Sequence, residues 1–460
     1  MEKLDVIFLA PDIGSLFGAV SLAAGGLKLL VLEEQTTPLT LKNADGENVP
    51  VPREPFLWRG LRTGAFLEPL LNRLKLLINA RGMVDHAEPP VQVVTPDARV
   101  DYFGSDQQLA RELKREFDAT EAKRVGDVLG NLTEWATKAY ELTAGDAYPP
   151  MSLGLAGRLF RREPDCRREL NEILKIPMGE FVGNGRVSGP ARVFLECIIA
   201  GLGLPVSNDL PACVAGLLLD GSRRGIYRAD EQALSRLLIS TFKKTGGYTM
   251  PISELEAVEM SKGGISALRM VKSNYIYSRL FVASETYISL LAEKTPGAVT
   301  SIRNRVHTLT VLAQSRVVPV GMGDRVVVVN RGSEMLYPEH VSRISVHRTA
   351  QADDKSEVFF TVESVRPAGM ESAQDELWDA LRNVAPFIDE YVISHKYDVK
   401  EASYSTSHRR AFLELPSDNN LANLLPRESD LLAEMGMGEG VISGRILPRV
   451  ILRKLGLRTE

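Results

Sequence analysis

The chain has 460 residues, which is long enough for two domains that each bury a substantial core. Hydrophobic residues make up 44% and charged residues 25%, and both fractions are typical of a soluble globular protein. Lysine and arginine number 55 against 59 aspartate and glutamate residues, so the net charge of -4 gives no electrostatic reason to expect nucleic acid as a partner.

The first elements predict a βαβ unit. Residues 6–9 form an apolar run that is typical of a strand buried on both faces. Residues 14–24 predict a helix that ends at two glycines, and residues 29–32 predict a second buried strand, which ends at Glu33. A strand, a tight turn, a helix and a strand in about 30 residues open a doubly wound parallel sheet.

The middle of the chain mixes helical and strand patterns. Residues 35–55 are polar and predict a long loop. Helices are predicted over residues 106–142, after the Ser188-Gly189-Pro190 start signal, and over residues 230–244. Short strands are predicted at residues 248–252, 265–270 and 275–283.

The last third returns to β structure before it ends in a helix. Residues 305–365 predict an antiparallel sheet with strands at 308–312, 326–329, 344–347 and 358–362. Residues 372–395 predict a long helix kinked at Pro386. A Gly-rich turn at residues 435–440 precedes a closing helix through Leu455.

Cysteine and histidine usage indicates neither a disulfide framework nor a metal site. The three cysteines, Cys166, Cys197 and Cys213, are too scattered, and the six histidines have no close ligand spacing. The apolar run near the N-terminus is bracketed by Asp5 and Asp12 and is too short for the core of a signal peptide. We therefore expect a cytoplasmic protein without a metal.

Several segments resemble the phytoene desaturase and amine oxidase group of FAD-dependent oxidoreductases, whose wider fold includes the Rab GDP-dissociation inhibitors. The resemblance lies in residues 5–9 (DVIFL) with 13–16 (IGSL), residues 229–247, residues 281–284 (FVAS) and residues 438–445 (GEGVISGR). It implies an α/β fold, in which a Rossmann-like FAD/NAD(P)-binding domain is interleaved with an α+β substrate domain made of an antiparallel sheet and helices.

The resemblance also implies a domain organisation. Residues 1–80 correspond to the first Rossmann-type segment, 81–204 to a mainly helical insert of the substrate domain, and 205–284 to a return to the Rossmann-type domain. Residues 285–415 correspond to the antiparallel sheet and helix of the substrate domain, and 416–460 to the last Rossmann-type segment with the closing helix.

The chain departs from this family at the dinucleotide-binding turn. The glycines of the family's G-x-G-x-x-G pattern fall on Ala10, Asp12 and Ser15, although Gly14 is present beside them. An aspartate at the second position brings a negative charge to the place where helix amides would hold a pyrophosphate, and it can cap those amides itself. Pro11 removes a further backbone donor.

Some other positions favour binding of the cofactor, and others argue against it. Glu33 lies at the end of the second strand, where the family's ribose-binding acid belongs; the alternative is a solvated charge at a strand end. Gly438 and Gly440 match the family's last Gly-rich segment, or they serve only the turn. Residues 425–428 (LPRE) replace the family's small-Gly-Asp segment. We therefore predict that ordinary FAD binding is weak or lost.

Two hypotheses of function follow. The first is a degenerate, non-redox member of the fold that binds an apolar, isoprenoid- or lipid-like ligand or a protein partner. The alternative is an active FAD-dependent oxidoreductase, desaturase- or amine oxidase-like, acting on an isoprenoid-like or amine substrate.

No catalytic side chain can be named, because in this fold the flavin performs the redox chemistry. The apolar residues of the helical insert either line a pocket or form plain core (Phe194, Leu195, Ile198 and Ile199). The closing helix either touches a membrane surface, as a peripheral contact, or packs on the sheet.

Overall fold

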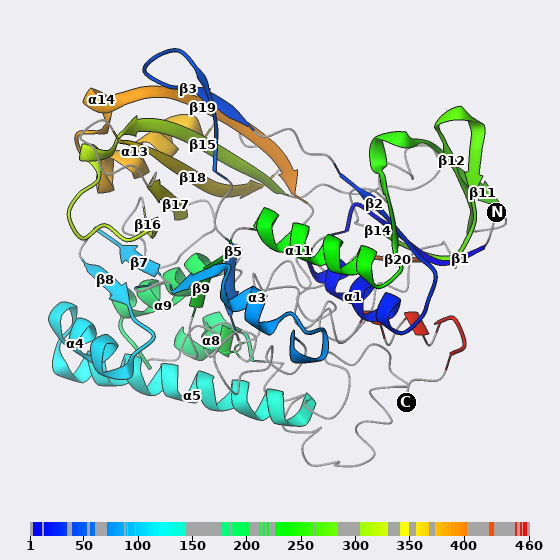
Figure 1. The fold of residues 1–460 in the computed structure, drawn as a ribbon. Coiled ribbons are helices and arrows are strands. Elements are labelled where there is room, and N and C mark those ends of the chain that lie inside the picture. Colours follow the sequence, from blue (N-terminus) through cyan, green and yellow to red (C-terminus); the bar gives the residue numbers. More distant parts are fainter. Residues whose placement is uncertain are drawn as a thin grey trace.

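The computed structural model describes most of the chain, and Figure 1 shows the arrangement of its elements. The residues that it describes are 3–11, 13–34, 39–52, 56–59, 71–86, 89, 91–96, 98–143, 176–183, 186–202, 212, 215–216, 219, 226–229, 231–261, 264–283, 304–329, 341–348, 356–367, 373–402, 423–426, 447–448, 451–452 and 454–457.

A parallel sheet is built from strands that lie far apart in the sequence. Its order is β10-β2-β1-β14-β20, and each neighbouring pair is parallel. The predicted βαβ unit is confirmed, because α1 connects β1 to β2. The bounds are β1 Leu4–Leu9, α1 Ile13–Ala24, β2 Leu29–Glu33, β10 Tyr248–Pro251, β14 Ser278–Ala283 and β20 Leu424–Pro426.

Both faces of the parallel sheet are covered. α1, α11 (Glu231–Lys244) and the closing helix pack on one face, where Phe17, Phe242 and Ile451 are buried in one cluster. A three-stranded antiparallel meander covers the other face, formed by β11 (Leu255–Ser261), β12 (Gly264–Met270) and β13 (Asn274–Ile276). Burial on two sides explains why residues 6–9 and 29–32 are continuously apolar.

A larger sheet forms the other half of the molecule, with the order β19-β15-β18-β17-β16-β7-β8. The predicted antiparallel sheet is confirmed for its central strands, although β16 and β7 are parallel. The bounds are β7 Val91–Val94, β8 Arg99–Tyr102, β15 Asn304–Gln314, β16 Arg325–Val329, β17 Val341–Arg348, β18 Glu357–Pro367 and β19 Val392–Ala402.

Helices cover both sides of the large sheet. α13 (Gln374–Val384) and α14 (Ile388–Tyr391) pack on what we call its outer face. On the inner face α9 (Gly189–Leu202) lies against β7 and β16, so closely that a Cβ on Gly201 would come within 2.5 Å of Val91 Cγ1. α4 (Asp106–Glu116), α5 (Ala119–Thr143) and α8 (Met178–Gly183) complete this helical layer.

Two predictions about secondary structure are wrong. The helix predicted over residues 372–395 is interrupted at Pro386: α13 ends at Val384, α14 follows, and residues 392–395 belong to strand β19 instead. The loop predicted over residues 35–55 contains a hairpin of β3 (Thr40–Lys42) and β4 (Asn48–Pro50), whose turn Asn43 closes by accepting from the Asp45 and Glu47 amides.

This hairpin packs on the large sheet. Leu41 is buried with Leu312 and Phe359, and Ser394 Oγ donates to the Lys42 carbonyl at 2.6 Å. A further small sheet has the order β5-β9-β6 and joins Phe56–Arg59, Ile226–Ala229 and Val84–His86, with helix α3 at Leu77–Arg81.

Candidate functional site

The turn between β1 and α1 keeps a glycine-like conformation without glycine. Ala10 occupies the first glycine position of the fingerprint and has a φ of 44°, in the left-handed region that residues with a Cβ rarely adopt. Its amide donates to the Leu32 carbonyl at 2.9 Å, and the residue is 3% exposed. The tight turn that the fold requires is therefore present, and alanine is the smallest substitute for glycine there.

The start of α1 is packed into the protein interior. The helix begins at Ile13, and Ile13, Gly14 and Ser15 are all buried. Ser15, at the third glycine position, has no exposed surface. Asp12 lies outside the described residues, so its capping of these amides stays a prediction. A small residue is needed at position 15 for packing in any case.

Gly18, one turn further on, has a structural role. A Cβ on Gly18 would lie 3.3 Å from Leu447 Cδ2 of the closing helix. The buried residues Leu447, Ile451 and Leu455 hold this helix in the core beside α1, and Arg279 Nη2 donates to the Leu455 carbonyl at 2.9 Å. The described apolar residues of the closing helix therefore pack on the parallel-sheet half.

The ribose-binding position carries an acid that already has a cationic partner. Glu33 ends β2, and Lys243 Nζ of α11 lies 3.5 Å from its Oε1. Both side chains are partly exposed, at 35% for Glu33 and 53% for Lys243, so the pair adds little to stability. A ribose hydroxyl at Glu33 would compete with Lys243 for the same carboxylate.

The last strand of the parallel sheet is anchored by a side chain that the sequence did not reveal. Asn423 accepts a hydrogen bond from the Ile265 amide at 2.9 Å and donates to the Ile265 carbonyl at 2.8 Å, which ties β20 to the meander. Leu425 and Pro426 belong to β20. Gly438 and Gly440 lie outside the described residues.

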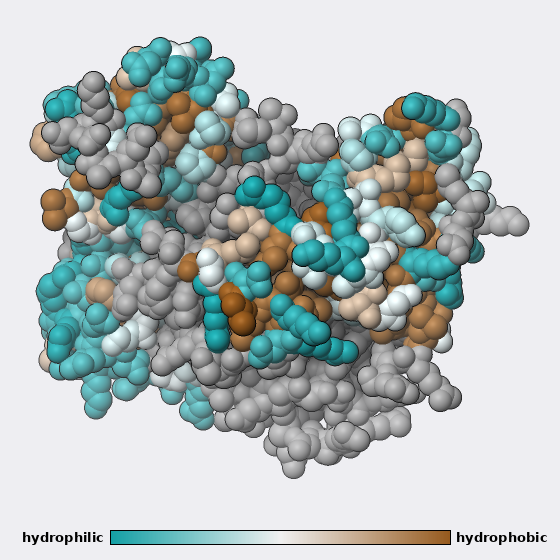
Figure 2. Space-filling model, viewed as in Figure 1, coloured by the Kyte–Doolittle hydropathy of each residue, from teal (hydrophilic) through white to brown (hydrophobic). Residues whose placement is uncertain are grey.

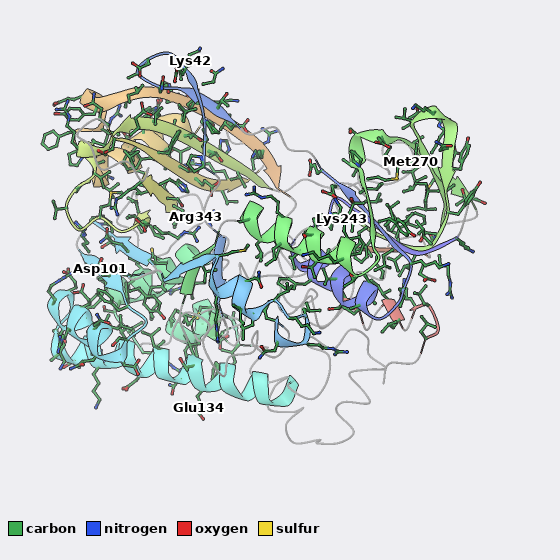
Figure 3. All side chains as sticks on the ribbon, in the orientation of Figure 1. Lys42, Asp101, Glu134, Lys243, Met270 and Arg343 are labelled. Carbon is green, nitrogen blue, oxygen red and sulfur yellow. The ribbon has the colours of Figure 1, made fainter. Side chains whose placement is uncertain are left out.

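The inner face of the large sheet carries a group of polar side chains, here called the polar strip: Thr310, Arg343, Ser345, Thr361 and Glu363. Arg343 stands opposite Glu363 and donates to its carboxylate, while Ser345 and Thr310 both stand opposite Thr361. Figure 3 shows Arg343 on the side of the sheet toward the middle of the molecule. The strip is half-buried to buried, with Ser345 2% exposed.

Apolar covers lie on either side of the polar strip. Val327, which pairs with Arg343 across β16 and β17, belongs to the core under α9. Phe359, two residues before Thr361 on the same face, packs against the β3–β4 hairpin. The inner face therefore combines ion-pairing and hydroxyl groups with an apolar surround.

A buried carboxyl group lies in the helix that covers this face. Glu196 of α9 is 1% exposed, its Oε1 accepts from Arg192 Nε at 2.9 Å, and its Oε2 has no hydrogen-bond partner among the described residues. Burial raises the pKa of Glu196, although Arg192 opposes the shift. Burial also raises the pKa of the adjacent Cys197, which argues against a thiolate nucleophile there.

The neighbours of Glu196 that the sequence offered as pocket or core belong to the core. Phe194, Leu195, Ile198 and Ile199 are each at most 1% exposed and share one cluster with α5 and α8. Glu196 itself was missed; the signal available was a single acid inside an otherwise apolar helical run.

Metal-binding groups and membrane-spanning helices are both absent from the described part of the chain. Within it, no group of histidine, cysteine, aspartate and glutamate residues is arranged to hold a metal ion. None of its described helices is long and apolar enough to cross a membrane.

A scan against protein-family models and a search of curated proteins find no match. Solved structures do match. A Rab GDI from Plasmodium falciparum is similar over 100% of this chain and 99% of its own, with a TM-score of 0.58 and 12% identity. An oxidoreductase from Methanosarcina mazei is similar over 98% of this chain and 100% of its own, with a TM-score of 0.55 and 11% identity.

A putrescine oxidase with a redesigned cofactor-binding site is similar over 99% of both chains, with a TM-score of 0.54 and 13% identity. Identities this low speak for the fold and leave the chemistry open. This chain has the fold that FAD-dependent oxidoreductases share with Rab GDP-dissociation inhibitors.

Proposed function

We propose that this chain is a non-redox member of the flavoprotein fold, which no longer holds FAD in the ordinary way and instead binds an apolar, lipid-like ligand or a protein partner. The turn at Ala10, Pro11 and Asp12 carries the proposal. It retains the backbone conformation that the fold needs, since Ala10 is left-handed, but it lacks the glycine and the donor that a pyrophosphate needs.

Two further features of the turn region support loss of the cofactor. The first residues of α1 are buried, so their close packing with the core is explained without a phosphate. The acid at the ribose position has Lys243 as a partner. A fold that also serves Rab GDP-dissociation inhibitors does not by itself require flavin chemistry.

For the ligand we propose the inner face of the large sheet, at the polar strip. Arg343, Glu363 and the buried hydroxyl groups beside them would orient a polar end group. The apolar residues under α9 and the hairpin would surround an aliphatic or aromatic body.

The alternative function is an FAD-dependent oxidoreductase acting on an isoprenoid-like or amine substrate. Glu33 favours it, because the residue stands at the end of the second parallel strand, beside the expected adenosine. If FAD bound, Glu33 would hold the ribose and the start of α1 would face the pyrophosphate, while the flavin would supply the redox chemistry.

The visible absorption spectrum of the natively purified protein separates the two functions. We expect a colourless protein that takes up no added FAD, measured by quenching of flavin fluorescence during titration. A stoichiometric flavin band would overturn the proposal.

A double variant then tests whether the turn is the cause. Ala10→Gly with Asp12→Gly should improve FAD uptake, whereas the control Asp45→Gly, which removes a charge from the exposed turn of the hairpin, should not. No gain in the double variant, with both proteins folded, would mean that features outside the turn exclude the cofactor.

A further inference from the structure

A segment around α3 presents an aliphatic and basic surface to solvent. Ile78 is 86% exposed and Met83 is 37% exposed, and Arg73, Lys75 and Arg81 of the same segment are also exposed. We call these five residues the α3 surface. Figure 2 shows hydrophobic atoms over α3 bordered by hydrophilic ones.

The α3 surface is held in place from beneath. Leu71, Leu76, Leu77 and Ala80 are all buried and join the core around α1 and α11. Ile78 therefore points outward from a packed segment.

The charge of the segment is one-sided. Between Glu68 and Asp85 the sequence contains Arg73, Lys75 and Arg81 and no acidic residue. Aliphatic side chains among cations match the chemistry of an anionic lipid surface, where the apolar groups enter the headgroup boundary and the cations meet the lipid phosphates and carboxylates.

Lys75 occupies a backbone position that favours glycine. Its φ is 57°, its amide donates to the Asn72 carbonyl at 3.0 Å, and the Leu76 amide donates to the Leu71 carbonyl at 2.8 Å. This is the way in which a helical turn ends at a left-handed residue, usually glycine. Glycine would fit this position at least as well, so the charge of Lys75 can be removed without a loss of stability.

We propose that the α3 surface docks the protein on a bilayer that contains anionic lipid. The inference goes beyond the proposed function and does not depend on it. The closing helix, which the sequence offered for this contact, is a poorer match because Leu447, Ile451 and Leu455 are buried.

The test is co-sedimentation of the protein with vesicles of phosphatidylcholine alone or of phosphatidylcholine with phosphatidylserine. Binding should require phosphatidylserine and weaken as salt is added. Lys75→Gly should lower the partition coefficient about fivefold, the effect of one basic residue near an anionic surface, while leaving thermal stability equal or higher.

Lys272→Gly is a matched control, because Lys272 is also an exposed lysine with a positive φ, 67°, but lies on the meander. It should leave vesicle binding unchanged. Ile78→Ser, at an exposed position, should lower the partition coefficient about tenfold through lost insertion.

Three results would overturn the proposal. They are failure to bind anionic vesicles, equal binding to neutral vesicles, and binding that Lys75→Gly and Ile78→Ser leave intact. Self-association in the absence of lipid, abolished by Ile78→Ser, would assign the surface to a second copy of the chain instead.

Discussion

The parallel sheet and the large sheet use their two faces differently. β1 and β2 are buried between helices and the meander, and the residues on both of their faces are apolar. The large sheet has one apolar face, under α13, whereas its inner face carries the polar strip. In the parallel sheet binding chemistry must therefore come from the loops at strand ends. In the large sheet the strands themselves can supply it.

The largest effect is expected where the parallel sheet is most apolar. Phe281→Ala should lower the free energy of unfolding by about 3–5 kcal/mol, because the ring has no exposed surface and its loss leaves a cavity between the sheet and the meander. Urea unfolding followed by circular dichroism measures it. Phe387→Ala is the control: that ring is 63% exposed, and the loss should stay below about 0.5 kcal/mol. Equal losses would contradict the description of this core.

The polar strip should respond to the loss of a charge rather than to the loss of volume. Arg343→Ala should cost about 1–3 kcal/mol, between the values for exposed and fully buried pairs, because Glu363 is left half-buried without this partner. Combining Arg343→Met with Glu363→Leu should recover most of the loss. If the double variant loses as much stability as Arg343→Met and Glu363→Leu lose singly when added together, Arg343 and Glu363 do not act as a pair.

Glu196 provides a pH-dependent test in the helical cover of the large sheet. Its folded-state pKa is raised by burial, so its contribution to stability is most favourable below the ordinary carboxyl range and falls as the pH rises through the folded pKa. Glu196→Gln should therefore raise the free energy of unfolding at neutral pH by about 1 kcal/mol. The gain should disappear near pH 4, where the wild-type carboxyl is protonated. A gain independent of pH would rule out titration as its cause.

The smallest effect concerns the turn at the edge of the parallel sheet. Ala10→Gly should raise the free energy of unfolding by about 0.5–1 kcal/mol, since glycine accepts the left-handed φ of 44° at the cost of some unfolded-state entropy. Ala19→Gly, inside α1 and fully buried, should lower it by about 1 kcal/mol. Thermal unfolding of both variants decides the point, and a shift of the same sign in both would refute the strain at Ala10.

Elements with buried faces could be predicted from the sequence, because burial dictates the pattern. The strands at residues 6–9 and 29–32 and the helix between them were correct for this reason. β19 was missed because it is the edge strand of its sheet, and residues 394–402 carry mostly polar side chains without the apolar alternation that marks a half-buried strand. The β3–β4 hairpin was missed because its strands are only three residues long.

The candidate site was less predictable, since its features depend on tertiary contacts. The sequence located Ala10, Ser15 and Glu33, but the left-handed φ of Ala10 and the partner of Glu33 arise only when α11 and the sheet are assembled. Arg343 and Glu363 meet only through the register of β17 and β18. No local sequence pattern predicts that these two side chains form an ion pair.

The β3–β4 hairpin gives the molecule a mechanical property. The hairpin follows the second parallel strand in the sequence, yet it packs on Leu312 and Phe359 of the large sheet. Figure 1 shows β3 beside β19. A segment that follows the parallel sheet in the sequence is therefore part of the core of the other half. The hairpin is therefore expected to move as part of the large sheet unless Leu41 leaves its contacts with Leu312 and Phe359.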